Sequence, residues 1–108
     1  MKLKPLGGLV TVKLLEDRAS IKRYQYQSRS GRLDAFEYLC GEVVTVGFED
    51  TACFTSDDGF HIVQKIPMVV KKGDIVLLHP PDLIETHFKG ETFYMVPQRG
   101  IYAVIEES

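Results

Sequence analysis

The sequence predicts an all-β fold, a small β-barrel or sandwich, and three observations favour this class. No stretch of ten or more residues carries apolar side chains at helical spacing, so no amphipathic helix is expected. Short segments rich in β-branched and aromatic residues follow one another instead, as in a series of strands. Turn residues separate these segments about every 8–12 residues, a spacing typical of barrels and sandwiches.

The first half of the chain is expected to hold two strands separated by a long loop. Apolar and polar residues alternate over residues 9–15, which indicates a half-buried strand. Residues 18–38 show no lasting period and are rich in serine, glutamine, arginine and glycine. We therefore expect a long loop that is mobile in at least one state. Residues 41–47 then form a short β-branched strand between glycines.

A hairpin is expected over residues 48–67, because Asp57, Asp58 and Gly59 supply a turn between apolar segments. A pair of prolines ends the strand that follows over residues 75–78, since proline cannot sit inside a sheet.

The last elements are a second hairpin over residues 83–96 and a closing strand over residues 101–105. Simple alternation places Ile101, Ala103 and Ile105 on one face of this closing strand.

Length and composition describe one globular domain over residues 1–108. The chain is 44% hydrophobic and 26% charged, which are ordinary globular values. No apolar run has the roughly 18 residues of a membrane span, and the N-terminus does not resemble a secretory signal. We expect a cytoplasmic protein without a membrane partner, in which Cys40 and Cys53 remain reduced.

The net charge of −2 conceals an asymmetry. Five cations and no acid lie between Arg18 and Leu33, while the remaining 8 basic and 15 acidic residues sum to −7. A basic segment on an acidic body needs a functional explanation.

Chemical motifs do not indicate an enzyme. No nucleophile elbow is present, and His61, His79 and His87 are isolated from other ligand or base residues in the sequence. No histidine or cysteine spacing fits a metal site, and the glycines are separated turn residues. We expect no catalytic residue, metal or cofactor in this chain.

Several motifs, in the same order and at similar spacing, resemble the GroES (chaperonin-10) family of bacterial co-chaperonins. They are Met-Lys-Leu-Lys-Pro-Leu-Gly at residues 1–7, Gly-Glu-Val-Val-Thr-Val-Gly at 41–47, Lys-Gly-Asp-Ile-Val-Leu at 72–77, Phe-Tyr-Met-Val at 93–96 and Ile-Tyr-Ala-Val-Ile-Glu at 101–106. The resemblance implies a small GroES-like β-barrel with a long mobile loop at about residues 16–38. It also implies a roof hairpin at about 48–67, with Asp57, Asp58 and Gly59 at its tip.

The resemblance further implies a homo-oligomeric ring, a heptamer in this family. The N-terminal segment, with Leu3 and Leu6, would pair with Ile101, Ala103 and Ile105 of the neighbouring subunit. Such pairing would cover strand edges that a monomer leaves open. The alternative is that both terminal segments pair within one chain.

The implied function is that of a co-chaperonin. Its ring caps an ATP-driven, GroEL-type chaperonin through the mobile loop and encloses unfolded substrate proteins. ATP is bound by the chaperonin, so the resemblance implies no cofactor here.

This chain departs from the family pattern in the loop, which lacks the usual glycine-preceded aliphatic tripeptide. The favoured substitutes for chaperonin contact are Leu33, Ala35 and Phe36; a second set is Ile21 with Tyr24 and Tyr26, and a third is Phe36 with Tyr38 and Leu39. The roof and cavity-lining segments differ as well, and a divergent, bacteriophage-type member would show such changes.

Two alternative functions remain open. A GroES-fold assembly scaffold without chaperonin binding would explain the missing tripeptide. A nucleic-acid-binding β-barrel could use the basic loop 18–32, with Tyr24 and Tyr26 stacking on bases. The acidic remainder of the chain argues against the second alternative, because it would repel phosphate.

Overall fold

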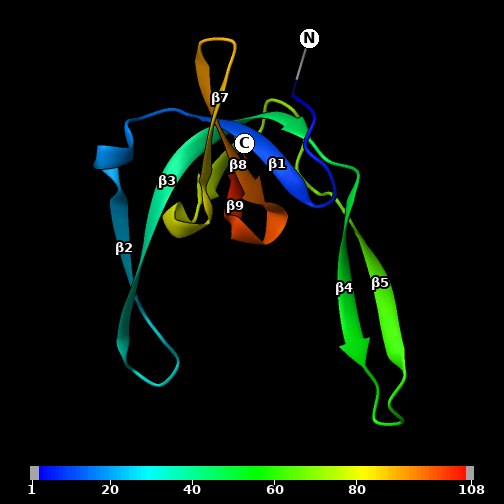
Figure 1. The fold of residues 1–108 in the computed structure, drawn as a ribbon. Helices are drawn as coiled ribbons and strands as arrows, with labels where there is room; N and C mark the ends of the chain where they lie inside the picture. The colour runs from blue at the N-terminus through cyan, green and yellow to red at the C-terminus, as the bar shows by residue number, and fades with distance from the viewer. Residues whose placement is uncertain (1–2, 107–108) are drawn as a thin grey trace.

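The computed structural model describes residues 3–106 and confirms the all-β class (Figure 1). The strands are β1 (Leu9–Leu14), β2 (Lys22–Gln27), β3 (Leu33–Val46), β4 (Glu49–Thr55), β5 (His61–Pro67), β6 (Ile75–Leu78), β7 (Ile84–Phe88), β8 (Glu91–Pro97) and β9 (Ile101–Ile105). Three single 3-10 turns join them: η1 (Arg18–Ser20), η2 (Pro80–Asp82) and η3 (Gln98–Gly100). Within residues 3–106, no helix is long and apolar enough to cross a membrane.

Seven strands form one antiparallel sheet in the order β7-β8-β1-β3-β6-β9, with β2 paired to an extension of β3. β4 and β5 form a separate two-stranded sheet. Figure 1 shows β1 and β3 arching over β8 and β9. This strongly curled sheet is consistent with the small GroES-like β-barrel that the sequence predicts.

The core lies inside this curl and is built from alternate residues of its central strands. Val10 and Val12 of β1 are fully buried, as are Val76 and Leu78 of β6. The other buried apolar side chains are Leu39, Val43, Val70, Leu83 and Val96. The alternation predicted for the first strand holds for Val10, Val12 and Leu14, which contact the core. Thr11, expected on the outer face, is also buried, at 1% exposed.

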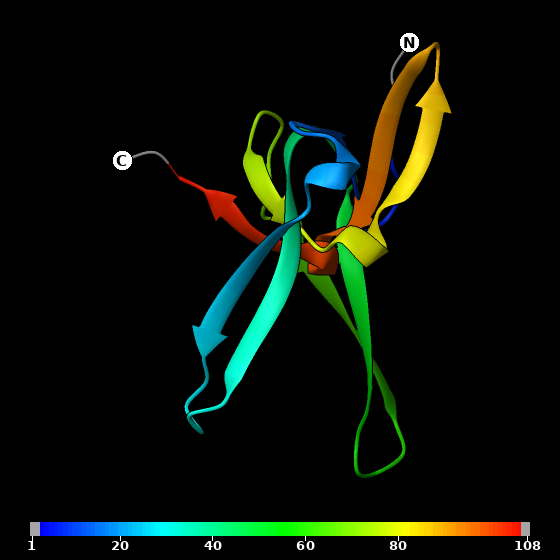
Figure 2. The same ribbon diagram turned by 90° about the vertical axis from the view of Figure 1, so that its left-hand side faces the viewer.

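Three hairpins project from the barrel. β2–β3 and β4–β5 extend to one side, and β7–β8 extends to the other (Figures 1 and 2). The turn between β4 and β5 contains Asp57, Asp58 and Gly59, and Gly59 has a φ of 83°. Glycine adopts this left-handed conformation without the steric penalty that a Cβ imposes. The segment expected to be a hairpin over residues 48–67 is therefore one.

The expectation of an irregular loop over residues 18–38 is wrong. This segment forms η1, β2 and the first part of β3, and β2 pairs with β3 from Lys22 opposite Tyr38 to Gln27 opposite Leu33. As a result β3 is 14 residues long, instead of the short strand expected over residues 41–47. The missed signal is a period of two in Lys-Arg-Tyr-Gln-Tyr-Gln, where Tyr24 and Tyr26 alternate with polar residues.

The expected common face of Ile101, Ala103 and Ile105 is also wrong. Ile101 pairs with Leu78, but Ala103 pairs with the adjacent Leu77, so β9 has one extra residue at this point. Such a bulge reverses the alternation that follows it. Ile101 and Val104 consequently pack against the core, while Ala103 and Ile105 are exposed.

Leu39 marks the point where β3 passes from the projecting hairpin into the core. Its side chain is only 1% exposed, so Leu39→Ala removes buried contacts and leaves a cavity. We expect the free energy of unfolding to fall by about 2–5 kcal/mol.

The matched control is Leu33→Ala on the same strand, where the side chain is 78% exposed. Its effect should stay within about 0.5 kcal/mol. Urea denaturation of both variants at one protein concentration makes the comparison, and equal losses of stability would contradict this assignment of the core.

Candidate functional site

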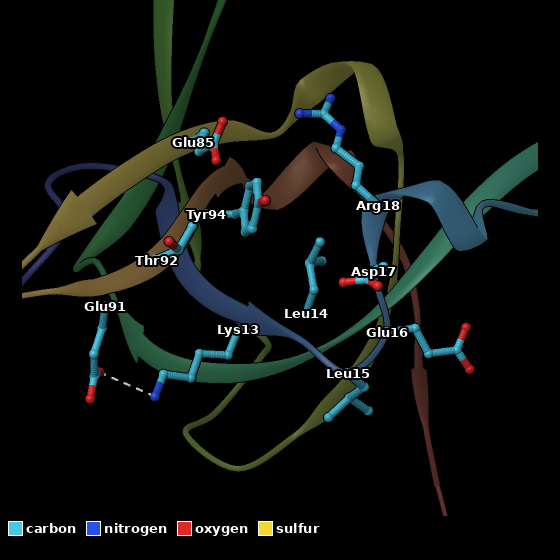
Figure 3. Close-up of a pocket in the computed structure, with 10 residues that line it drawn as sticks. All are labelled: Lys13, Leu14, Leu15, Glu16, Asp17, Arg18, Glu85, Glu91, Thr92 and Tyr94. Carbon is cyan, nitrogen blue, oxygen red and sulfur yellow. Dashed lines mark ion pairs between the residues drawn. The ribbon is translucent and has the colours of Figure 1, made fainter.

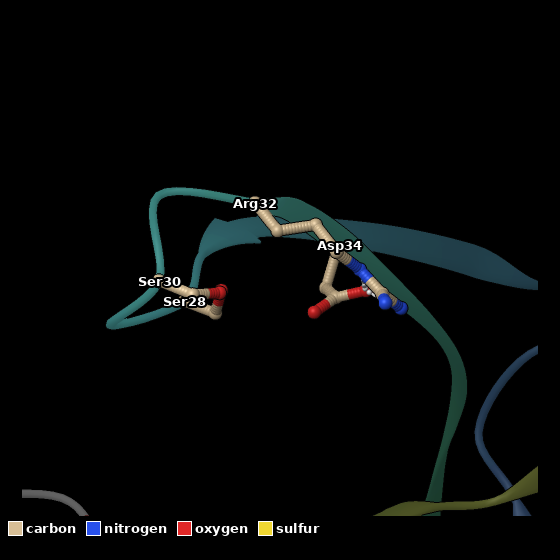
Figure 4. A network of polar contacts seen from close by, with 4 residues as sticks. All are labelled: Ser28, Ser30, Arg32 and Asp34. Atoms are coloured by element: carbon tan, nitrogen blue, oxygen red, sulfur yellow. Dashed lines mark hydrogen bonds and ion pairs between the residues drawn. The ribbon is translucent and has the colours of Figure 1, made fainter.

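The β2–β3 hairpin occupies the position where the sequence places the partner-binding loop. Its tip is closed by local contacts: the Ser28 amide donates to the Arg32 carbonyl at 2.9 Å, and the Gly31 amide donates to the Ser28 carbonyl at 2.9 Å. The hydroxyls of Ser28 and Ser30 lie 2.9 Å apart, and Arg32 forms an ion pair with Asp34 at 2.9 Å (Figure 4). Gly31, with a φ of 82°, supplies the left-handed residue of this turn.

One face of the hairpin carries a cluster of aromatic rings, which we call the aromatic face. Tyr24 lies directly opposite Phe36 in the strand register, and their ring centroids are 5.4 Å apart. Tyr26 and Tyr38 lie 6.1 and 6.0 Å from the same Phe36 ring. Contacts of this kind stabilise antiparallel strand pairs beyond the area that they bury.

This cluster extends beyond the hairpin to the last strand. The ring of Tyr102, on β9, lies 4.8 Å from that of Phe36, the shortest of the aromatic ring distances in the described part of the chain. The His79 ring contacts Tyr102 edge-on at 5.6 Å, and its Nδ1 lies 2.8 Å from Oδ2 of Asp82. Sequence reasoning missed Tyr102, because the bulge in β9 that directs its side chain is not visible in an alternating pattern.

On the aromatic face Tyr24 and Tyr26 are still 54% and 42% exposed. The opposite face of the hairpin carries no ring of this cluster and is also open to solvent, and we call it the open face. Strand alternation places Arg23, Gln25, Leu33, Ala35 and Glu37 on it. At 78% exposed, Leu33 has the highest value among the exposed large apolar residues of the described chain. Leu33 and Ala35 are the apolar residues of this open face.

The structure therefore separates the favoured contact residues. Leu33 and Ala35 lie on the open face, but Phe36 lies on the aromatic face, so the three do not form one patch. Tyr24 and Tyr26, from the second candidate set, join Phe36 in the cluster. Of the remaining candidates, Ile21 precedes β2 and is exposed, Leu39 belongs to the core, and Tyr38 is partly buried in the cluster.

Polar contacts hold the base of the hairpin. Nη2 of Arg18, on η1, donates to the Pro80 carbonyl of η2 at 3.1 Å. Nζ of Lys22 donates to Oε1 of Glu16 at 3.0 Å, and this hydrogen bond, with the charge of Glu16, raises the pKa of the Lys22 ammonium.

Beside these residues is an open cavity of about 780 Å³ between the end of β1 and the β7–β8 hairpin (Figure 3). Its lining mixes both charge signs, including the Lys13–Glu91 ion pair at 3.2 Å.

The five cations of the basic segment have different roles. Arg18, Lys22 and Arg32 make the contacts described above, while Arg23 and Arg29 form no ion pair within residues 3–106. Tyr24 and Tyr26 already contact other rings. Fewer cations are thus free for phosphate than a nucleic-acid-binding loop would offer, which weakens that alternative.

The terminal segments lie on different parts of the sheet. The Leu3 carbonyl accepts a hydrogen bond from Oγ1 of Thr45 on β3 at 3.0 Å, and Leu6 is 73% exposed. β9 pairs with β6 and forms one end of the strand order. Among residues 3–106, the two terminal segments do not pair with each other.

Comparison with known proteins gives one consistent result. No protein-family model matches the chain. The chain is 36% identical over 106 residues to a co-chaperonin GroES of Solidesulfovibrio magneticus, covering 98% of this chain and 99% of the relative. It is 31% identical over 106 residues to that of Ruminiclostridium cellulolyticum, covering 98% and 100%. It is 30% identical over 102 residues to that of Lactobacillus acidophilus, covering 94% and 97%.

The phenol of Tyr102 reports on the packing of the aromatic cluster. Burial raises the pKa of Tyr102 above its ordinary value of 10.0, and electrostatic interactions with Asp82 and Tyr26 add to the shift. Because the fold favours the neutral phenol, the stability linked to Tyr102 is fully present below pH 10.0. It is lost as the pH rises through the raised pKa.

We therefore expect the ring Cζ resonance of Tyr102, assigned with the Tyr102→Phe variant, to titrate with a midpoint above pH 10.0. A midpoint at or below this value in the folded protein would contradict the packing described for this ring.

Proposed function

Because this chain belongs to the GroES co-chaperonin family, we propose that it forms a ring-shaped lid that binds an ATP-driven, GroEL-type chaperonin and encloses folding substrate proteins. The observation that carries the proposal is identity of 36% to a co-chaperonin over nearly the full length of both chains. The projecting β2–β3 hairpin supports it, because it lies between β1 and the barrel part of β3, where the family's contact loop is expected. In this proposal the chaperonin binds ATP, and this chain needs no cofactor.

Unpaired strand edges support the proposed ring. In the proposed heptamer, the N-terminal segment with Leu3 and Leu6 adds to the outer edge of β9 in the neighbouring subunit. The exposed side chains of Ala103 and Ile105 support this contact, whereas Ile101 belongs to the core of its own subunit. Closing such edges in a ring removes sites at which unrelated chains could pair.

The β4–β5 hairpin is the proposed roof of the cage. It projects from the barrel and diverges from the β2–β3 hairpin toward its tip in both views (Figures 1 and 2). Its apolar side chains are exposed in the single chain, Phe54, Phe60 and Ile62 among them. A two-stranded hairpin is marginal by itself in water, so roof hairpins that meet around a ring would stabilise one another.

The scaffold alternative has one specific observation in its favour. The hairpin carries no aliphatic tripeptide, and the favoured apolar substitutes are divided between its two faces. An intact ring that binds no chaperonin would support this alternative.

The first test measures the mass of the protein in solution and asks whether a substitution on β9 lowers it. A ring of seven 12.2 kDa chains has a mass of about 85 kDa, which sedimentation equilibrium measures. Ile105→Glu places a charge at the proposed contact and should shift the protein toward monomer at micromolar concentration. Leu33→Glu, an equal change on the hairpin, should leave the mass unchanged.

Either of two results would contradict the ring as described. One is a stable wild-type monomer, and the other is an Ile105→Glu variant that retains the full mass.

The second test removes the hairpin and keeps the barrel. Arg23 and Glu37 lie directly opposite each other, so Asn-Gly in place of residues 24–36 should close a tight turn between them. We expect this variant to keep the mass of the ring and to lose ATP-dependent capture by a purified chaperonin, because the contact surface is gone.

Capture that persists after the replacement would show that another surface makes the contact. The wild-type ring is the positive control, and omission of nucleotide is the negative control.

A further inference from the structure

The sheet face opposite the core carries a pocket that is separate from the β2–β3 hairpin. Its volume is about 280 Å³, and it lies between the N-terminal segment, strands β1 and β3, and the β7–β8 hairpin. Four apolar side chains line it, Leu3, Val44, Phe88 and Phe93. A mainly apolar pocket with a few polar groups is the usual form of a small-molecule site.

The floor of this pocket contains a hydroxyl without a partner. Thr11 of β1 lines the pocket and is 1% exposed, and its buried Oγ1 forms no hydrogen bond within residues 3–106. Thr45 lies directly opposite on β3, but its hydroxyl donates to the Leu3 carbonyl at 3.0 Å. A buried polar group without a partner is rare, because it has lost its water without compensation. The Thr11 hydroxyl therefore favours a ligand that offers a hydrogen-bonding atom.

The rim of the pocket is positively charged. Lys72 and Lys89 line it, are exposed, and form no ion pair in the described part of the chain. Glu91 lines it as well, but its carboxylate pairs with Lys13 at 3.2 Å. Lys89 has a φ of 51° at the first position of a two-residue hairpin turn, where asparagine, aspartate or glycine is usual. The charges at the rim favour an anionic ligand.

We propose that this pocket binds a small phenolic carboxylate, an aromatic ring with a hydroxyl at one end and a carboxylate at the other. The hydroxyl pairs with Oγ1 of Thr11 on the floor, the ring packs against Phe88 and Phe93, and the carboxylate lies near the two lysines at the rim. Aromatic pairs contribute more than the area that they bury, which favours a ring over an alkyl chain.

The size of the pocket agrees with this class of ligand. A volume of about 280 Å³ lies just below the range of about 300–1,000 Å³ that drug-sized ligands occupy, so one ring with a short chain is expected. A neutral ligand would leave both lysines unpaired. A ligand without the hydroxyl would leave Thr11 Oγ1 unpaired.

The test is a calorimetric titration with para-hydroxyphenylpropionate. The assembled protein is used, because Leu3 also belongs to the segment that is proposed to contact a neighbouring subunit. Phenylpropionate, which lacks the hydroxyl, should bind roughly 2- to 13-fold more weakly, the range expected for one hydrogen bond. The amide of para-hydroxyphenylpropionate, which lacks the charge, should also bind more weakly than the acid.

Two variants assign these differences to the protein. Thr11→Val removes the hydroxyl and keeps the branched shape, so it should bind the two acids equally. Its urea midpoint should not fall, because this hydroxyl has no partner in the described chain. Lys72→Gln should weaken both acids by roughly 1.5- to 5-fold, as expected for an exposed charge pair. Lys71→Gln, at a neighbouring lysine that does not line the pocket, is the matched control and should leave binding unchanged.

Any of three results would overturn the inference. They are a Kd for para-hydroxyphenylpropionate above about 1 mM, a Thr11→Val variant that still distinguishes the two acids, and equal weakening by Lys71→Gln and Lys72→Gln. The titrations contain neither chaperonin nor nucleotide, so their outcome is independent of the proposed co-chaperonin function.

Discussion

The long strand β3 is the constraint on which the rest of this structure depends, because one continuous strand belongs to both the barrel and the hairpin. From Leu39 onward its alternate residues enter the core, and before that point they pair only with β2. The pairing of β2 with β3 continues the line of the core half of β3 out of the barrel. The ring contact between Phe36 and Tyr102 adds a second connection, to β9.

The sequence predicted the part of β3 that lies in the barrel but not the part that extends into the hairpin. The strand β1 was predictable because its apolar and polar residues largely alternate, and β6 was predictable because a run of four apolar residues ends before a pair of prolines. The turn at Asp57–Gly59 was predictable because glycine marks it. The β2–β3 hairpin was not, because both its faces are largely exposed and its period of two is carried by tyrosines and glutamines. Alternation of aromatic with polar residues indicates a strand as well, and it deserves equal weight with aliphatic alternation.

The candidate site was predictable in its location but not in its faces. Family resemblance places a contact segment between the first two strands, and the hairpin lies there. Which residues share a face depends on strand register, which fixes Leu33 and Ala35 opposite to Phe36. Tyr102 enters the cluster from a strand more than sixty residues away in sequence, past a bulge that no local pattern reveals. Contacts of this kind arise from tertiary structure, and motif reading alone does not find them.

The charge asymmetry of the chain gains a structural explanation from the same hairpin. Arg18 and Lys22 hold its base and Arg32 stabilises its tip, so most of the basic segment serves the position of the hairpin. Exposed ion pairs contribute little stability individually. In this hairpin one ion pair lies at the base and one at the tip, and the aromatic cluster packs between them. If several copies project from a ring, each contact with a partner can be weak, because the copies bind together. Such avidity requires the copies to reach their sites simultaneously.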